Sequence, residues 1–196
     1  MDAVIIDSGG ANLASLQYAF ERLGARTRVS AEASEIAAAA RVVLPGVGSA
    51  GDAMQRLRRA GIARVLPSLT QPVLGICLGM QLLFERSAEG ATQCLGLLPG
   101  EVRRLTAAPG RPVPHMGWNR LGERKADPLL DGIEPDAYFY FVHGYALPAC
   151  ELTVAPVHYG EALSAVVRRD NFWGVQFHPE RSAASGARLL GNFLRL

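Results

Sequence analysis

Cysteine and lysine are scarce in this sequence of 196 residues. Its three cysteines, Cys77, Cys94 and Cys150, form no CxxC pair and stand at no Cys/His spacing typical of a zinc site. An odd number of such thiols argues against a disulfide framework and fits a reducing compartment, so we expect a cytoplasmic protein without a bound metal. Lysine occurs only at Lys125, and the scattered arginines are better explained by a composition bias of the source genome than by function.

The sequence has no strong excess of charge of one sign and no long apolar run, and we expect no signal peptide. The net charge of +2 is too small to indicate a nucleic-acid partner. No apolar run approaches the length that spans a membrane, and the N-terminus leads into a strand without the basic and apolar regions of a secretory signal. With 49% hydrophobic and 19% charged residues, the chain is typical of a globular protein that buries a full core. We expect residues 1–196 to form one domain.

The first half of the chain alternates apolar runs with segments of helical periodicity. The runs predict buried strands at residues 4–6, 41–44 and 73–76. The periodic segments predict helices at residues 13–23, 32–40 and 52–60. This alternation predicts a parallel sheet covered by helices on both faces. Ligands bind at the carboxyl ends of the strands in such sheets, so we expect the functional site there.

The second half of the chain has strand patterns separated by short polar turns. We expect strands at residues 101–105, 138–143, 152–157, 162–167 and 173–177. The last segment, residues 182–196, is predicted to be an amphipathic helix. Antiparallel strands added to the parallel sheet are the simplest explanation of this half.

A reactive residue flanked by glycines, in Gly75-Ile76-Cys77-Leu78-Gly79, lies between a predicted strand and a run of helix formers. This spacing is typical of a nucleophile elbow, a strand-to-helix turn so tight that only glycine fits two positions on either side. The turn would place the thiol at a helix N-terminus, where the helix dipole favours the thiolate. The alternative is a buried structural cysteine on an ordinary strand-to-helix turn.

A histidine and a carboxylate follow the last predicted strand, in Phe177-His178-Pro179-Glu180. Pro179 disfavours the helical conformation for His178, and residues two apart in an extended backbone point to the same side. Glu180 can then hold the imidazole, as the acid of a nucleophile–base–acid triad does. The alternative is a chance surface turn, which the nearby elbow makes less favoured.

Residues 45–48, with the sequence Pro-Gly-Val-Gly, end the second predicted strand. Glycines at a strand end can present backbone N–H groups without obstruction, so this segment and the N–H of Leu78 would form an oxyanion hole. Alone, the segment would indicate only a strand-ending turn.

The other three histidines carry weaker signals. His115 lies in an unusual stretch, residues 114–119, whose function the composition does not define. We expect His143 to be structural or to contact the backbone, and His158 to be an ordinary strand residue. None has metal-ligand spacing, and no cofactor is expected.

Taken together, these residues resemble the class I (triad) glutamine amidotransferases over essentially the whole chain. The shared motifs are residues 45–48, 75–81 and 174–180. Further stretches are similar to one branch, the glutaminase subunits of imidazole glycerol phosphate synthases: residues 82–85, 96–100, 114–119 and 140–143. The resemblance implies an α/β, flavodoxin-like domain with a mostly parallel sheet flanked by helices and additional antiparallel strands in the second half.

The resemblance also implies a role for each candidate residue. Cys77 would attack the carboxamide of glutamine, while His178, held by Glu180, moves the proton, and the glutamyl thioester would be hydrolysed to glutamate. The oxyanion donors would be Val47, Gly48 and Leu78. In this family the strand of residues 45–48 needs a peptide rearrangement, driven by the partner's ligand, to complete the oxyanion hole. Substrate contacts are expected from Gly46, Gln81, His143, Gly144 and Tyr145. Partner contacts are expected from Asn12, Trp118, Asn119, Tyr140 and Arg181.

A single glutaminase domain has no site that uses the ammonia. Ammonia released into neutral water is protonated and loses its nucleophilicity, so it has to pass on under cover. The resemblance implies a heterodimer with a (β/α)8-barrel cyclase, whose ribotide substrate accepts the nitrogen. The products would be imidazole glycerol phosphate and aminoimidazole carboxamide ribotide, in histidine biosynthesis.

The sequence departs from the family pattern in the loop of residues 7–12, at Ser49 and Ala50, at Gly144, where serine is frequent, and at Arg181, where lysine is usual. The last two bear on glutamine affinity and partner contacts. Three alternatives stay open: the glutaminase subunit of anthranilate or aminodeoxychorismate synthase, a stand-alone cysteine hydrolase, and a silent binding subunit. Residues 114–119 disfavour the first, Gln81 the second, and the complete triad the third.

Overall fold

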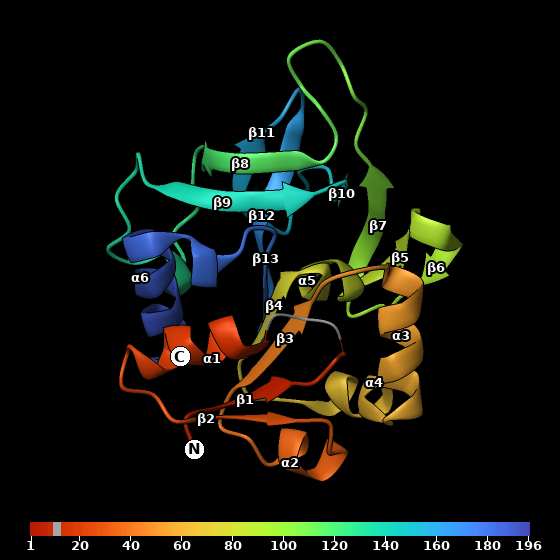
Figure 1. Ribbon diagram of the computed structural model, residues 1–196, viewed down its shortest axis with the longest axis vertical. Coiled ribbons are helices and arrows are strands. Elements are labelled where there is room, and N and C mark those ends of the chain that lie inside the picture. The colour runs from red at the N-terminus through yellow and green to blue at the C-terminus, as the bar shows by residue number, and fades with distance from the viewer. Residues whose placement is uncertain (10–12) are drawn as a thin grey trace.

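A seven-stranded sheet forms the centre of the computed structural model, which describes residues 1–9 and 13–196 (Figure 1). Its strands are β1 (Ala3–Ile6), β2 (Thr27–Ser30), β3 (Val42–Gly46), β4 (Val73–Cys77), β11 (Thr153–His158), β12 (Ala162–Arg169) and β13 (Phe172–Val175). Their order across the sheet is β11-β12-β13-β4-β3-β1-β2. The strands from β13 to β2 pair in parallel, and antiparallel pairing adds β12 and β11. The mostly parallel sheet predicted from the sequence is therefore confirmed.

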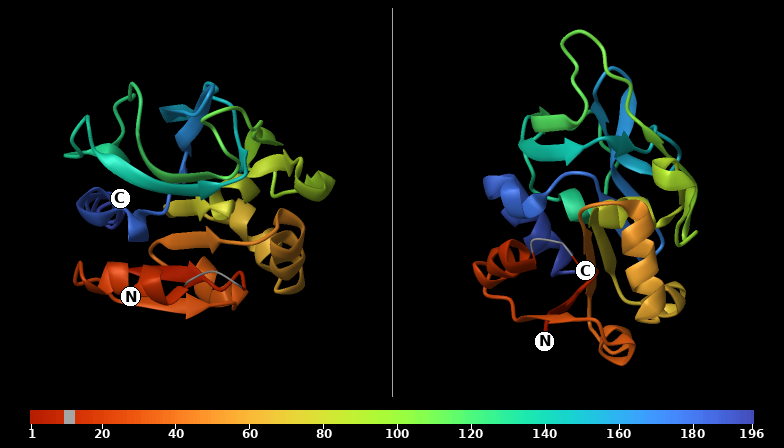
Figure 2. Two further views of the ribbon diagram at one scale, coloured as in Figure 1. Left: turned by 45° about the horizontal axis from the view of Figure 1, so that its top comes forward. Right: turned by 45° about the vertical axis from the view of Figure 1, so that its right-hand side comes forward.

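Helices cover both faces of this sheet. Those of the described residues are α1 (Leu13–Glu21), α2 (Ala33–Ala37), α3 (Ala50–Arg59), α4 (Ile62–Val65), α5 (Leu78–Leu82) and α6 (Ala183–Phe193). Successive side chains of a strand point to opposite faces, so Ile5 packs with α1 and α6, whereas Val4 packs with α3 and α4. Figures 1 and 2 show these two helix pairs on opposite sides of the sheet. Burial on both faces explains why the inner strands are apolar throughout.

The remaining strands form two smaller sheets. One has the order β10-β7-β5-β6, with β10 (Tyr145–Ala146), β7 (Leu98–Arg104), β5 (Phe84–Ser87) and β6 (Thr92–Gln93). The other pairs β8 (His115–Arg120) antiparallel to β9 (Tyr138–His143), with His115 opposite His143. The expected strands at residues 101–105 and 138–143 thus exist, but they belong to these sheets and do not extend the central one.

Some elements differ from the sequence prediction for local reasons. Strand β2 was not predicted, because this edge strand of Thr27–Ser30 has only one buried residue and no apolar run. The stretch of residues 114–119 lies mostly in β8, where exposed and less exposed side chains alternate. The helix after Cys77 ends at Leu82, since Phe84 already begins β5. The predicted helix of residues 32–40 is the shorter α2.

Candidate active site

Cys77 ends β4 in a strained backbone conformation, with φ 53° and ψ −111°. The flanking glycines make this turn possible. A Cβ atom added to Gly75 would lie 2.8 Å from the backbone nitrogen of Met80, and one added to Gly79 would lie 1.7 Å from the carbonyl oxygen of Leu44. The turn therefore has the geometry that the Gly-x-Cys-x-Gly spacing predicts.

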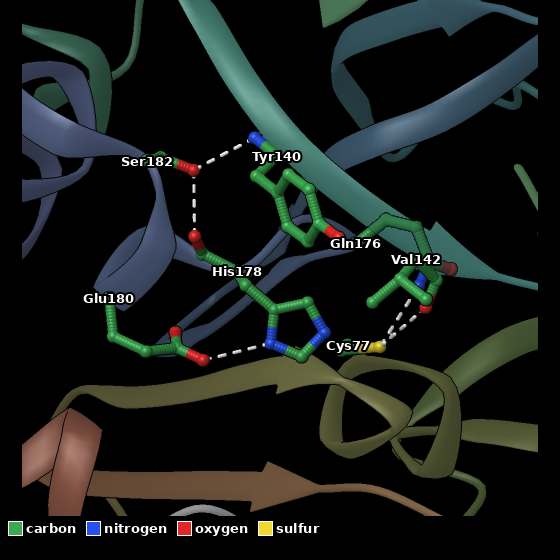
Figure 3. Close-up of polar contacts among 7 residues, drawn as sticks. All are labelled: Cys77, Tyr140, Val142, Gln176, His178, Glu180 and Ser182. Carbon is green, nitrogen blue, oxygen red and sulfur yellow. Dashed lines mark hydrogen bonds and ion pairs between the residues drawn. The ribbon is translucent and has the colours of Figure 1, made fainter. Parts of the chain in front are cut away.

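The thiol of Cys77 is buried between strands from both halves of the chain. Its sulfur lies 3.8 Å from the carbonyl oxygen of Val142, on β9. The side-chain amide of Gln176, just after β13, donates to the same sulfur at 3.7 Å (Figure 3). Gln176 is fully buried. The motif of residues 174–180 therefore supplies two residues to the site: His178 and an amide that contacts the sulfur.

His178 and Glu180 form the contact expected from their spacing. Nδ1 of His178 lies 2.9 Å from Oε1 of Glu180 (Figure 3). His178 itself is extended, with φ −101° and ψ 98°, as the following proline predicts. The expected extended backbone for Glu180 is wrong, because the 3-10 turn Pro179–Arg181 carries this residue. One turn of helix brings the carboxylate back beside the imidazole.

The backbone of His178 is anchored to β9. Its N–H donates to the carbonyl of Tyr140 at 2.9 Å. The hydroxyl of Ser182 donates to the carbonyl of His178 at 2.7 Å and accepts from the N–H of Tyr140 at 3.0 Å (Figure 3). Ser182 is buried, and nothing in the sequence marked it as part of the site. These bonds fix the position from which the imidazole reaches the thiol.

The surroundings of His178 favour its protonated form. Burial by itself lowers the pKa of the imidazole, but hydrogen bonds to Cys77 and Glu180, together with the charges of these two groups, raise it to about 10. The imidazole therefore carries a proton at neutral pH. It can give this proton to a group that leaves from an acyl carbon next to the sulfur.

A cavity of about 530 Å³ opens beside Cys77, at the carboxyl ends of β3 and β4. This volume lies within the range of roughly 300–1,000 Å³ that small-molecule sites have. The candidate oxyanion residues Val47, Gly48 and Leu78 line the cavity. Gly48 has a φ of 88°, a conformation that favours glycine. The cavity thus lies where the rule for parallel sheets predicts a ligand site.

The candidate substrate residues line the same cavity: Gly46, Gln81, His143, Gly144 and Tyr145. The amide of Gln81 donates to the carbonyl of Tyr145 at 2.9 Å and to Oε1 of Gln176 at 3.0 Å. Nδ1 of His143 also donates to the carbonyl of Tyr145, at 2.9 Å, which is a backbone contact of the kind expected for this histidine.

Glu89 is a cavity residue that the sequence analysis missed. It begins the 3-10 turn Glu89–Ala91, and its Oε2 accepts from the N–H of Ala50 at 2.7 Å. Glu180 is already paired with His178, so Glu89 gives the cavity a carboxylate that is free of the triad contact. A negative charge here suits a ligand with an ammonium group. No motif surrounds Glu89 in the sequence, so only the fold reveals its place.

Most of the expected partner residues gather on one surface beside the cavity. Trp118 is 52% exposed and packs edge-on against Tyr140, with ring centroids 5.9 Å apart. The guanidinium of Arg181 lies 4.8 Å from the centroid of the Tyr140 ring. Asn119 differs, because its amide turns to the carbonyl of His158 and to the ring of His115. Asn12 lies outside the described residues.

The other two cysteines lie outside the set of residues that line the cavity. Burial raises the pKa of the Cys94 thiol to about 11, while Cys150 is exposed. Within residues 1–9 and 13–196, no group of three or more histidine, cysteine or acidic side chains is arranged to hold a metal ion. No helix in that part of the chain has the length and apolar character needed to cross a membrane.

Residues 4–196 match the family model of the class-I glutamine amidotransferases, and the chain belongs to this family. Imidazole glycerol phosphate synthase subunit HisH of Xylella fastidiosa is 53% identical over 195 residues, which cover 100% of this chain and 98% of that protein. HisH of Xanthomonas euvesicatoria is 54% identical with the same coverage. A solved glutamine amidotransferase superposes with a TM-score of 0.78 over 100% of this chain and 98% of its own, at 18% identity, which supports the fold.

Proposed function

We propose that this chain is the glutaminase subunit of an imidazole glycerol phosphate synthase, acting as one amidotransferase domain in the cytoplasm. The observation that carries the proposal is the meeting of Cys77, His178 and Glu180 at one cavity. Full-length identities of 53% and 54% to subunits of that synthase support the choice of this branch.

The reaction begins with the sulfur of Cys77, whose proton His178 has taken and which forms a bond to the carboxamide carbon of glutamine. The carbonyl oxygen becomes an oxyanion, which the N–H of Leu78 and the N–H groups of residues 47–48 stabilise. His178 then donates its proton to the amide nitrogen as the C–N bond breaks, so ammonia leaves and a glutamyl thioester remains. Finally, His178 takes a proton from water, which attacks the thioester; the C–S bond breaks, glutamate leaves and the Cys77 sulfur is free again. Glu180 holds the imidazole in position throughout.

The cavity lining supplies groups that suit each end of glutamine. Glu89 offers a carboxylate for the α-ammonium group, and the backbone N–H groups near Gly144 and Tyr145 suit the α-carboxylate. Gln81, fixed by its bonds to Tyr145 and Gln176, lines the same cavity. At Gly144, where the family often has serine, an added Cβ would lie 3.7 Å from Cγ1 of Val113, its nearest atom. The site therefore has room for either residue with the same backbone, so glycine here is compatible with this role.

The ammonia passes to a (β/α)8-barrel cyclase that docks on the exposed apolar surface of β8 and β9. Trp118, Met116 and Tyr138 contribute to this surface and are 52%, 62% and 46% exposed. A cluster of large exposed apolar side chains is typical of a protein–protein contact. The cyclase uses the ammonia to make imidazole glycerol phosphate and aminoimidazole carboxamide ribotide.

The test is glutamine hydrolysis by the purified chain alone, with the cyclase, and with the cyclase plus its ribotide substrate. We expect strong activity only in the full mixture. Cys77→Ala should reduce glutamine-dependent synthesis by at least about 10³-fold and leave ammonia-dependent synthesis by the partner unchanged. Cys150→Ala, at the exposed thiol outside the cavity lining, is the matched control.

Two outcomes would contradict the proposal. High glutaminase activity of the isolated chain would count against coupling to the partner. Loss of both glutamine-dependent and ammonia-dependent synthesis in Cys77→Ala would give Cys77 a structural role instead of a catalytic one.

A further inference from the structure

Two buried histidines lie next to the cavity, and the proposed reaction uses neither as an acid or a base. His115 and His143 stand opposite each other on β8 and β9 and are 4% and 5% exposed. Nδ1 of His115 lies 3.0 Å from Nε2 of His143. A polar pair this deeply buried is costly unless every donor and acceptor has a partner, so the contacts of both rings define what the pair does.

The contacts assign the hydrogen atoms of both rings. The carbonyl of Tyr145 can only accept, so Nδ1 of His143 carries a hydrogen and donates to it at 2.9 Å. Nε2 of the neutral His143 ring then accepts from Nδ1–H of His115. This leaves Nε2 of His115 as an acceptor for the amide of Asn119, at 3.4 Å. Each ring is thus neutral, with one donor and one acceptor in use.

The same line of hydrogen bonds continues to the sulfur of Cys77. The carbonyl of Tyr145 also accepts from the amide of Gln81 at 2.9 Å, and this amide donates to Oε1 of Gln176 at 3.0 Å. The amide of Gln176 in turn donates to the sulfur at 3.7 Å. The carbonyl of Tyr145 therefore determines the orientation of the Gln81 amide, and the Gln81 amide determines that of Gln176.

Aromatic packing holds the outer histidine in place. The ring of His115 is stacked between Phe141 and Tyr159, with centroids 4.9 Å and 4.0 Å away. The hydroxyl of Tyr159 donates to the carbonyl of Pro112 at 2.6 Å. Burial lowers the pKa of both His115 and His143 to about 4, so the neutral rings that the hydrogen bonds require persist at neutral pH.

We propose that His115 and His143 are positioning residues for the glutaminase reaction, an inference that rests on the proposed function. The set of Asn119, His115, His143, Gln81, Gln176 and the carbonyl of Tyr145 is called here the histidine network. It orients the amide of Gln176 toward the sulfur of Cys77 and holds the Gly144–Tyr145 segment that lines the cavity. The two rings act through hydrogen bonds in a fixed direction and exchange no proton with the substrate.

Four variants separate the hydrogen bonds from the packing. His143→Asn keeps an amide donor at the position of Nδ1, facing Tyr145, whereas His143→Gln moves the amide to the ε position and loses this donor. His115→Phe keeps the stacking with Phe141 and Tyr159 but removes both hydrogen bonds. His158→Asn changes an exposed histidine of β11 and is the control.

Each variant is assayed with the cyclase and its ribotide substrate for kcat and KM, and for its thermal midpoint. The pH dependence of Cys77 alkylation by iodoacetamide is followed by peptide mass spectrometry, which separates Cys77 from the other thiols. We expect His143→Gln and His115→Phe to lose about 10- to 100-fold in kcat. In both, alkylation of Cys77 should be slower at each pH, because the amide of Gln176 is no longer held in position to donate to the sulfur. His143→Asn should regain most of the kcat lost in His143→Gln, and His158→Asn should match the wild type.

Other results would overturn the inference. If His143→Gln and His115→Phe keep the wild-type kcat and alkylation profile, the network does not position the thiol. If their thermal midpoints fall while kcat and the profile stay unchanged, the histidines are only structural. A wild-type chain that shows no glutaminase activity in the full mixture would refute the proposed function instead, so the two failures are distinguishable.

Discussion

Gly79 and Leu44 are packed so closely that a single Cβ atom on Gly79 would lie 1.7 Å from the carbonyl oxygen of Leu44. The first turn of α5 therefore rests directly on the backbone of β3. This contact holds the end of β4 beside the end of β3, and so it brings Cys77 next to residues 45–48. Packing alone therefore requires glycine at position 79, whatever reaction Cys77 carries out.

Gly79→Ala should destabilise the protein severely, because the added methyl group can be accepted only if α5 or β3 moves. Overpacking of this kind costs about 1–3 kcal/mol or more, so the urea midpoint should fall clearly. Gly191→Ala is the control, since the nearest atom to its added Cβ is 3.8 Å away and α6 gains helix propensity. Equal stability of the two variants would contradict the packing argument.

The elbow and the histidine motif could be predicted because local sequence determines them. Glycines two positions before and after Cys77 leave room for the tight turn, and proline after His178 disfavours a helical backbone at that residue; the structure has both features. The apolar runs of β1, β3 and β4 likewise predicted a sheet buried on both faces. These features depend on neighbours within a few residues.

The features that the sequence missed depend on contacts between distant segments. Glu89 enters the cavity through its bond to Ala50, 39 positions away. Ser182 anchors His178 through Tyr140, on a strand 42 positions earlier. The pairing of β8 with β9 brings His115 opposite His143, and nothing near either residue in the sequence predicts this contact. Such contacts leave no periodic pattern in the sequence.

Ser182→Ala should reduce both glutaminase activity and stability. The change removes the donor to the carbonyl of His178 and the acceptor for the N–H of Tyr140, and each buried group left unpaired costs about 1–3 kcal/mol. We expect kcat to fall about tenfold as the imidazole loses its fixed position. Ser185→Ala, three residues further along in α6, is the control, and the prediction is wrong if both variants have equal kcat.

The ionisation of His178 should make stability depend on pH. Its pKa is raised from 6.5 to about 10 in the folded protein, so the stabilising contribution is fully present below pH 6.5 and is lost as the pH rises to about 10. In Glu180→Gln the raised pKa should fall, because one of the two groups that favour the protonated ring is neutral. Nitrogen chemical shifts of the labelled imidazole across this range measure both values. A ring that titrates identically in the two proteins would contradict the assignment of Glu180.

Trp118→Ala should weaken binding of the proposed cyclase partner. A large aromatic side chain at the centre of a contact typically contributes about 2 kcal/mol or more, so we expect the dissociation constant to rise at least about 30-fold in calorimetry. Arg59→Ala is the control. Arg59 ends α3, and α3 and β9 pack on opposite faces of the central sheet. If the two variants bind equally well, β8 does not carry the docking surface.

The most direct test of the central claim is covalent labelling of the chain by a diazoketone analogue of glutamine, followed by mass spectrometry. We predict a single adduct, located on Cys77, whose formation is slowed by excess glutamine and abolished in Cys77→Ala. Labelling of Cys150 at the same rate, or labelling of Cys77 that glutamine does not slow, would contradict the assignment of this cavity as a glutaminase site.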